Sequence, residues 1–436
     1  MADKRSPDPG PGRGPDPATP STQSPPSALS ALSTQRLTVT TPWHPSAQRP
    51  FAGSFVQAAT RAIAPSFARA ELFHTEDWPG PANSYAARVV RRAHDNLLRR
   101  ENNGVAARLT DDGYWVTDVP TPVTPKRDYA DWAYSHEAAL GAVLNGAKFD
   151  ADVVHGHVGT YGGWLALRFA PRKARVVVTE HASFLGRMLG QPRSRAIYAQ
   201  VMERADAVTC VSDALRTQLA TAFPGHAAKI SVLPNAVDIE AMPVRPKPIQ
   251  DLHRWIFVGK VAAPKGVPEL VEAFALAARD EPRLRLTVLG SGPLVSPLRA
   301  RAAELGLSAR IEFVDAVPPE RVFEYLHEHD LLVHPSKGET FGMTVVEAVG
   351  AGMPVLVTRC GGPQETLAGL EGVAGALIEV SDDPAVIVDG YRALAAQADR
   401  FDPDRARDVL IGRYGSAAVA DRLAAVYLGS EGRERK

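Results

Sequence analysis

The sequence has few cysteines, no excess of charge of either sign and no long apolar run. Its two cysteines, Cys210 and Cys360, lie far apart, so neither a disulfide framework nor a zinc knuckle is predicted and a reducing, cytoplasmic setting is expected. Lys plus Arg and Asp plus Glu number 49 each, which argues against a nucleic-acid partner because such binding needs a basic surface. No apolar stretch has the length of a membrane span, and the opening MADKRSPDPGPGRG lacks the apolar core of a signal peptide.

Length and local composition predict two domains, because 436 residues exceed what one hydrophobic core normally holds. Residues 1–35 are rich in Pro, Ser, Thr and Gly, with almost no large apolar side chains, and are expected to be disordered. The stretch 239–253 holds three prolines with mixed charge and indicates a linker, with a long loop inside one domain as the less favoured alternative. The predicted ranges are an N-terminal domain over 36–240, a linker over 241–253, a C-terminal domain over 254–408, and a final helix over 409–430 that packs back toward the N-terminal domain.

Apolar strands alternate with helical segments in both halves of the chain. The first half has LTVTT (37–41), a helical stretch over 54–64, and then DVVHGH, RVVVTEH, AVTCVS and KISVLP. The stretch 65–135 does not show a clear order of elements. The second half has RWIFVG, LRLTVLG, IEFVDAV, DLLVHPS and PVLVTRC. Uniformly apolar strands separated by helices predict parallel sheets covered on both faces. Two such sheets facing each other form a cleft at the carboxyl ends of their strands, where ligands bind.

Two lysines follow the first strand of the second half. Lys260 and Lys265 precede a helix that begins near Pro268, a position that suits proline. Cations at a helix N-terminus oppose the helix dipole, so their presence is explained if an anion binds there. Two solvated surface lysines are an equally weighted alternative.

A glycine-rich turn follows the next strand. In VLGSGPLVSPL, Gly290 and Gly292 come between a strand and a helix, but Val295 stands where a dinucleotide fingerprint has its third glycine. The pattern is therefore weak evidence for dinucleotide binding. It remains compatible with a tight turn that lets the backbone approach a ligand.

Two glutamates bracket the turn KGETFGMTVVEAVG. Glu339 follows the strand DLLVHPS, and Glu347 lies about one turn inside the next helix. Amide groups of Phe341, Gly342 and Met343 come just before that helix or at its start, so they are expected to point at the cleft. The carboxylates are compatible with a general acid/base pair and equally with hydrogen bonding to ligand hydroxyls.

These motifs together resemble the family 4 retaining glycosyltransferases. GKVAAPKG, GSGP and the E-x7-E spacing in PSKGETFGMTVVEAVGAGMPVLVTRCGGPQE match that family, and GSFV (53–56), TEHAS (179–183), CVSDAL (210–215) and LPNAVD (233–238) match it in order. The resemblance covers about 37–430. It implies an α/β protein of the GT-B fold, with two Rossmann-like domains whose parallel sheets face each other across a cleft. The chain departs from the family at Ala236, where glycine is usual, at Pro363, and at Lys260, where arginine is more frequent.

The resemblance also implies a function and its residues. A retaining, metal-independent and cofactor-free transferase would move a sugar from a nucleotide-diphosphate sugar to a small natural product, a polysaccharide precursor or a lipid-linked sugar. The acceptor hydroxyl would attack on the face that the phosphate leaves. The implied catalytic residues are His181, Lys260, Lys265 and Glu339. The implied donor-binding residues are Gly53, Ser54, Gly290, Gly292, Val317, Phe341, Gly342, Met343, Thr344 and Glu347.

Other interpretations remain open at this point. A sugar-nucleotide epimerase or phosphorylase of the same fold is one, and a non-catalytic nucleotide-sugar-binding protein is another. The Asp-x-Asp matches at 150–152 and 402–404 are interpreted as structural. His155 and His157 lie on one face of a strand and favour a polar strand end over a metal site. The basic segment 87–100 favours a solvated helix face over contact with a membrane or a lipid-linked acceptor.

Overall fold

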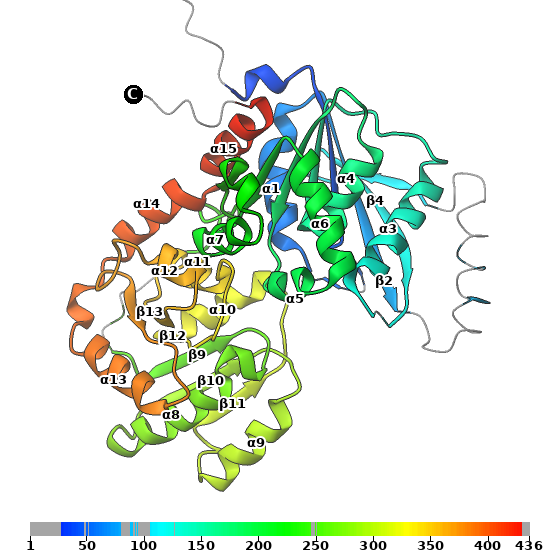
Figure 1. Ribbon diagram of the computed structural model, residues 1–436. Coiled ribbons are helices and arrows are strands. Elements are labelled where there is room, and N and C mark those ends of the chain that lie inside the picture. Colours follow the sequence, from blue (N-terminus) through cyan, green and yellow to red (C-terminus); the bar gives the residue numbers. More distant parts are fainter. Residues whose placement is uncertain are drawn as a thin grey trace, which may run out of the picture.

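Two α/β domains make up the described part of the chain (Figure 1). The computed structural model describes residues 28–429, with gaps at residues 48, 51, 80–87, 90–91, 93, 95–104, 126, 246–248 and 250. The first domain lies at the upper right of Figure 1 and the second at the lower left. Each is built on a mainly parallel sheet, as the alternation of strands and helices predicts.

The first domain contains an 8-stranded sheet with the spatial order β3-β4-β2-β1-β5-β6-β7-β8. Its neighbouring strands run parallel except β3 and β4, which form an antiparallel pair at one edge. The inner strands β5 and β7 are fully buried, as expected where helices cover both faces. The strands are β1 (Arg36–Thr41), β2 (Arg69–Pro79), β3 (Ala107–Leu109), β4 (Trp115–Val123), β5 (Val153–His157), β6 (Arg175–Glu180), β7 (Ala207–Cys210) and β8 (Ile230–Val232).

The second domain contains a 6-stranded, wholly parallel sheet with the order β11-β10-β9-β12-β13-β14. The sequence predicts its first five strands but not β14, a short segment that begins at a glycine and has only one β-branched residue. The strands are β9 (Arg254–Val258), β10 (Arg285–Leu289), β11 (Ile311–Val314), β12 (Leu331–His334), β13 (Val355–Thr358) and β14 (Gly375–Ile378).

Helices connect the strands in both domains. The helices of the first domain are α1 (Ser54–Ile63), α3 (Tyr129–Val143), α4 (Trp164–Phe169), α5 (Leu185–Leu189), α6 (Pro192–Arg204) and α7 (Asp213–Ala222), and a π-helical segment, Val158–Gly163, joins β5 to α4. The helices of the second domain are α8 (Val267–Asp280), α9 (Val295–Glu304), α10 (Pro319–Glu328), α11 (Met343–Gly350), α12 (Gly362–Thr366) and α13 (Pro384–Ala395). Short 3-10 helices occur at Ser30–Leu32, Ala64–Ser66, Pro224–Lys229, Ala263–Lys265 and Ala398–Arg400.

The C-terminal segment crosses from one domain to the other. Figure 1 shows it in red, running from the second domain up to the first as α14 (Pro403–Tyr414) and α15 (Ser416–Leu428). Helix α14 packs against α11, and α15 packs against α1 and β6. The sequence predicts one helix over 409–430, whereas the structure has two helices that are divided at Gly415, which adopts an extended conformation.

The predicted disordered segment also ends earlier than expected. Residues 1–27 lie outside the described residues, but Ser30–Leu32 forms a 3-10 helix. Leu32 is fully buried and packs into the core of the first domain. This apolar side chain supplies the anchor that the rest of the Pro- and Ser-rich segment lacks. The boundary predicted at residue 35 is therefore wrong, because order begins before it.

Both Asp-x-Asp matches have structural roles, as predicted. Asp152 Oδ2 accepts a hydrogen bond of 2.9 Å from the backbone N–H of Arg36, and Asp150 pairs with the guanidinium of the same arginine. Asp402 caps α14 by accepting from the N–H of Arg405 at 3.0 Å. The segment 87–100 lies outside the described residues, apart from residues 88, 89, 92 and 94. Within the described chain, no helix is both long enough and apolar enough to cross a bilayer.

Candidate active site

A salt bridge joins two of the predicted site residues in the second domain. Lys265 ends the 3-10 helix that precedes α8, and its Nζ lies against Oε1 of Glu339. The same oxygen is 2.9 Å from Nε2 of His334, the last residue of β12. Burial alone would raise the pKa of Glu339, but the hydrogen bond from His334 and the charges of His334 and Lys265 lower it to about 2. The carboxylate is therefore ionised and has a cation beside it.

The N-terminus of α11 follows Glu339. Gly342 caps this helix with φ at +86°, a left-handed conformation that glycine adopts without strain. The N–H groups of Met343 and Thr344 donate to no acceptor in the described chain, so the helix presents free donors and the positive end of its dipole. The Phe341 side chain is buried and packs edge-on against Tyr414, with ring centroids 5.1 Å apart. Free N–H groups at a helix start are the kind of donors that bind anions in proteins.

Glu347 lies one turn inside α11, and its environment is the opposite of that of Glu339. Its side chain is half-buried, and none of the described residues forms an ion pair or a hydrogen bond with its carboxylate. Burial raises its pKa to about 7. A carboxyl group in this position is available to accept hydrogen bonds from a ligand.

Two backbone turns pack together beside Lys260. The N–H of Gly259 donates to Leu289 O at 3.0 Å, and a Cβ on Gly290 would lie 1.9 Å from Gly259 O. A Cβ on Gly292 would likewise lie 2.2 Å from the carbonyl oxygen of residue 261. The two glycines therefore allow the turn after β10 to pack against the turn after β9. This packing explains them without a ligand.

Lys260 follows β9 and Val317 follows β11, two strands that are separated by β10 in this sheet. The Lys260 side chain is exposed and forms no ion pair with a described residue. Val317 is half-buried between β11 and α10. Of the two predicted lysines, only Lys265 is brought into contact with a glutamate of the site.

Gly53 and Ser54 begin α1 in the first domain. Gly53 caps the helix with φ at +69°, and a Cβ there would lie 2.2 Å from the carbonyl oxygen of Trp43. Glycine is therefore required for the loop between β1 and α1 to fold back on itself. Ser46 of this loop, residues 42–53, also contacts Glu76 near the carboxyl end of β2.

His181 follows β6 and is mostly buried. Its Nε2 lies 2.8 Å from Nδ1 of His157, and its ring lies 4.6 Å from that of Phe55. Burial lowers the pKa of His181 to about 3, so the imidazole is neutral at physiological pH. The buried carboxylate of Glu180 accepts from the N–H groups of His181 and Ala182 at 2.9 and 2.7 Å, which fixes the start of this loop.

His155 and His157 have different hydrogen-bond partners and do not point at a common metal site. The two ring nitrogens of His155 lie 2.8 Å from Tyr427 Oη and 2.7 Å from Thr179 Oγ1. Both nitrogens are therefore occupied by hydroxyl groups, as the interpretation of a polar strand end requires.

One group of potential metal ligands lies in the first domain, away from the salt bridge. The ligand atoms of His44, His74 and Asp118 lie within 4.8 Å of one another. Nδ1 of His74 is 2.9 Å from one oxygen of Asp118, and Nε of Arg108 is 3.5 Å from the other. These contacts already satisfy the carboxylate, so the group is explained as a hydrogen-bonded ion cluster.

The two domains touch at the predicted site. Asn235, in the LPNAVD turn of the first domain, has its Nδ2 3.8 Å from Sδ of Met343. The carboxylate of Glu365 in α12 accepts from the N–H groups of Asp213 and Ala214 at 2.8 and 3.2 Å. A side chain of the second domain thus caps α7 of the first. These contacts hold the carboxyl ends of the two sheets toward each other.

Comparisons with known proteins agree with this geometry. The model named Glycosyltransferase Family 4 matches residues 85–241, and the model named Glycosyl transferases group 1 matches residues 239–402. A D-inositol 3-phosphate glycosyltransferase of Geodermatophilus obscurus is 30% identical over 313 residues, which cover 63% of this chain and 68% of that protein. The chain belongs to the family 4 glycosyltransferases.

Two further relatives of this glycosyltransferase differ in their named substrates. A D-inositol 3-phosphate glycosyltransferase of Corynebacterium urealyticum is 30% identical over 230 residues, 48% of this chain and only 53% of that protein. A 2-deoxystreptamine glucosyltransferase of Streptomyces kanamyceticus is 27% identical over 358 residues, 73% of this chain and 90% of that protein.

Solved structures show the same fold as this glycosyltransferase. Sucrose-phosphate synthase from Thermosynechococcus elongatus has a TM-score of 0.67 at 16% identity and covers 92% of this chain and 100% of its own. Anabaena HepE in complex with UDP has a TM-score of 0.62 at 16% identity, with 91% and 100% covered. These likenesses establish the GT-B fold that the sequence motifs imply.

Several residues at this site are not found by sequence reasoning. His334 is the last residue of a strand predicted correctly, but nothing in its spacing shows that it contacts Glu339. Glu180 lies in the quoted motif TEHAS. The sequence does not show that its carboxylate is buried and accepts hydrogen bonds from four donors. Glu365 is the last residue of the quoted motif that ends in GGPQE, and its partners are about 150 residues away.

Proposed function

We propose that this chain is a retaining glycosyltransferase that moves a sugar from a nucleotide-diphosphate sugar to a hydroxyl group of an acceptor. The observation that carries the proposal is the contact between Lys265 and Glu339 beside the free N-terminus of α11. Glu339 neutralises Lys265 through this contact. A donor diphosphate would take over the lysine, and it would leave the glutamate free to accept hydrogen bonds from the sugar hydroxyls.

The nucleotide is proposed to bind in the second domain. Solved structures of Anabaena HepE hold UDP, UDP with glucose, or UDP-glucose, which supports a UDP-sugar as the first donor to test. Glu347 has no partner among the described residues, and it is proposed to accept hydrogen bonds from the hydroxyl groups of the ribose. The backbone near Val317 is proposed to meet the base, and Gly53 and Ser54 are proposed to close on the phosphates from the first domain.

Fixed positive charge would stabilise the leaving group. As the bond from the anomeric carbon to the phosphate oxygen breaks, charge develops on the diphosphate, next to Lys260, Lys265 and the α11 amide groups. The acceptor oxygen forms its bond to the anomeric carbon on the same face, and its proton passes to the departing phosphate oxygen. Neutral His181 orients the sugar and takes no covalent part. This scheme needs neither a metal nor a carboxylate nucleophile.

The acceptor is proposed to be a polyhydroxylated small molecule. Two kinds of relative are named for cyclitol rings, D-inositol 3-phosphate and 2-deoxystreptamine. Both rings present several hydroxyl groups. The first domain has carboxylates that can accept hydrogen bonds from hydroxyl groups and aromatic rings that can pack against a ring.

The matched lysines Lys265 and Lys337 test the proposal. Lys337 lies in the same domain and pairs with Glu269 at 2.7 Å and with Asp382. Lys265→Met should lower kcat/KM for the sugar donor about 100-fold, because one fixed charge on the leaving group is lost, whereas Lys337→Met should leave it within about twofold. Undiminished transfer by Lys265→Met would overturn the proposal.

Product analysis separates the alternative functions. A transferase releases nucleoside diphosphate only with an acceptor, and the anomeric configuration of its product, read by NMR, should match that of the donor. An epimerase would convert the donor without an acceptor, a phosphorylase would require phosphate, and a binding protein would show no turnover. Activity that survives EDTA is expected from the metal-independent scheme.

A further inference from the structure

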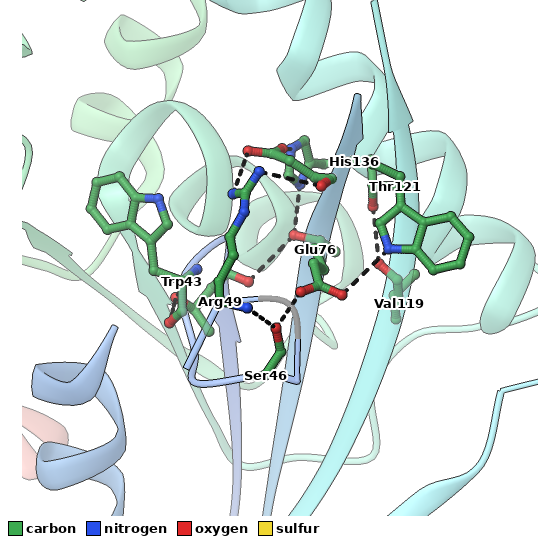
Figure 2. Close-up of polar contacts among 11 residues, drawn as sticks. Trp43, Ser46, Arg49, Glu76, Val119, Thr121 and His136 are labelled. Atoms are coloured by element: carbon green, nitrogen blue, oxygen red, sulfur yellow. Dashed lines mark hydrogen bonds and ion pairs between the residues drawn. The ribbon is translucent and has the colours of Figure 1, made fainter. Parts of the chain in front are cut away.

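Two acidic side chains end β2 in the first domain and take no part in the proposed donor contacts. Figure 2 shows Glu76 at the centre of this group, with Ser46 and Arg49 of the loop 42–53 on one side and His136 of α3 above. Glu76 and Asp77 are only 7% and 9% exposed. Burial of two adjacent carboxylates is unfavourable unless polar partners compensate for it.

Asp77 has a nitrogen partner on each of its two oxygens. Its Oδ1 lies 3.0 Å from Nε2 of His136, and its Oδ2 lies 3.5 Å from a guanidinium nitrogen of Arg49. Burial would raise the pKa of Asp77, but His136 and Arg49 lower it below its usual value. Asp77 is therefore an ionised group that lies just beneath the surface.

Glu76 has only neutral partners among the described residues. One carboxylate oxygen accepts from the hydroxyl of Ser46, and the other lies 3.3 Å from the indole Nε1 of Trp78. Trp78 is 38% exposed, so the group lies under an accessible aromatic ring. The pair of acids together with Arg49 carries one net negative charge.

Tyr161 supplies a second and independent observation. Its side chain is 4% exposed, and its hydroxyl has no hydrogen-bond partner in the described chain. Its ring lies 5.3 Å from that of His136. Burial and then the nearby charge of Asp77 raise the pKa of this phenol. A buried hydroxyl without a partner is unfavourable, and a ligand group bound between Tyr161 and Asp77 would satisfy it.

The Tyr161 segment is continuous with the proposed reaction centre. Tyr161 lies in the π-helical segment that follows His157, and His157 contacts His181 at 2.8 Å. A series of packed aromatic rings also extends from His181 to Tyr129. Trp43 packs against Phe55 and Phe184 with centroids 6.2 and 6.1 Å apart, Phe184 stacks on Tyr129 at 5.4 Å, and Phe55 packs against His181.

We propose that Tyr161 and Asp77, backed by Glu76, form an acceptor subsite that receives an ammonium group on a polyhydroxylated acceptor without phosphate. The inference rests on the proposed transferase function and names the substrate class of that site. The ammonium group would donate to the phenol oxygen of Tyr161 and to the carboxylate of Asp77. The aromatic rings beside Trp43 would pack against the acceptor ring.

The charge of the group favours an ammonium over a phosphate. A phosphate would meet two ionisable carboxylates, and the cation within the group, Arg49, is already held by Asp77. An ammonium would instead bring the net charge of the group to zero. An ammonium can donate to the carboxylate oxygens of Asp77 and to the phenol oxygen of Tyr161, all of which can accept hydrogen bonds.

Tyr161→Phe is a sharp test because the hydroxyl it removes has no partner in the folded protein. A structural role predicts unchanged or slightly higher thermal stability and no effect on acceptors. The proposed role predicts the same stability and a KM for an ammonium acceptor about tenfold higher, with kcat and UDP affinity unchanged. Tyr198→Phe is the matched control. Tyr198 is equally buried, but its hydroxyl donates to Glu180 at 2.8 Å, so this variant should lose stability without changing the preference among acceptors.

Three cyclitol rings serve as probes: 2-deoxystreptamine, myo-inositol and D-inositol 3-phosphate. Binding of each to the full chain, with and without UDP, should favour the diamine at least tenfold over myo-inositol, and Tyr161→Phe should remove that preference. Equal binding, a preference for the phosphate, or no binding of any ring would overturn the inference. Failure of UDP to bind would instead count against the proposed transferase function, while binding to the UDP-free chain still reports on the ring preference.

Discussion

Two acids of the second domain are held in opposite charge environments. Glu339 is half-buried against His334 and Lys265, and its pKa falls to about 2. Glu347 is half-buried with no partner in the described chain, and its pKa rises to about 7. One glutamate is thus ionised at every physiological pH, and the other titrates within that range. The cation beside Glu339 stabilises its ionised form. Glu347 lacks such a partner, and hydrogen-bond donors of a ligand would stabilise it.

Glu347 should make stability depend on pH. Its folded pKa of about 7 lies above the ordinary 4.5, so the folded state binds the proton more tightly and stability decreases as pH rises from about 4.5 to 7. Glu347→Gln removes this loss and should be more stable than the parent at pH 8 by about 2 kcal/mol, less than the full shift implies because the group is half-buried. Urea unfolding at pH 4.5 and pH 8 measures the difference, which should vanish at the lower pH. Parallel pH profiles for the two proteins would contradict the assignment.

The elements of the fold differ in how well the sequence predicts them. Apolar strands followed by helices are found from their pattern, because parallel strands buried on both faces have no polar positions. Strand β2 is different. Its 11 residues include His74, Glu76 and Asp77, and it pairs with β4 beside a three-residue antiparallel edge strand. Neither alternation nor a uniform apolar run marks such a segment, which explains why the order of elements over 65–135 is not predicted.

The candidate site is predicted in part for a similar reason. Glu339, Gly342 and Glu347 lie in one short region whose loop and helix start are visible in the sequence. Glu365 acts through partners that are distant in sequence, so no local pattern reveals its role. Lys265 and Glu339 are 74 residues apart in the sequence. The family resemblance, rather than their spacing, predicts that they belong to one site.

The cap that Glu365 places on α7 should hold the domains together. Glu365→Ala removes acceptors from the N–H groups of Asp213 and Ala214, and it should cost about 1 kcal/mol and increase the radius of gyration measured by small-angle scattering. Asp402→Ala is the matched control, because Asp402 caps α14 from its own chain segment. It should cost a similar free energy and leave the scattering unchanged. Identical scattering from the two variants would show that Glu365 is an ordinary cap.

At the scale of the whole molecule, the C-terminal helices complete both domains. Arg175 donates to Val426 O at 2.9 Å, and Tyr427 Oη lies 2.8 Å from His155. Val419, Leu423 and Tyr427 belong to the hydrophobic core of the first domain. The first domain is therefore built from two separate parts of the chain, and its integrity depends on α15.

Two leucines of α15 test this dependence. Leu423 is 1% exposed, whereas Leu428 at the end of the same helix is 37% exposed. Leu423→Ala should destabilise the protein by about 2–4 kcal/mol because it leaves a cavity in the first-domain core. Leu428→Ala should change stability by less than about 0.5 kcal/mol. Denaturant unfolding measures both, and equal values for the two variants would place α15 outside the core.

The place of α15 in the first-domain core also has a consequence for biosynthesis. A nascent chain emerges from the ribosome starting at its N-terminus, and domains that are complete in sequence fold as they emerge. Here the surfaces of α1 and β6 that α15 covers stay exposed until residues 416–428 have left the exit tunnel, after the entire second domain has been translated. The first domain therefore exposes an apolar surface throughout that interval. We expect chaperones that bind nascent chains to cover this surface during translation.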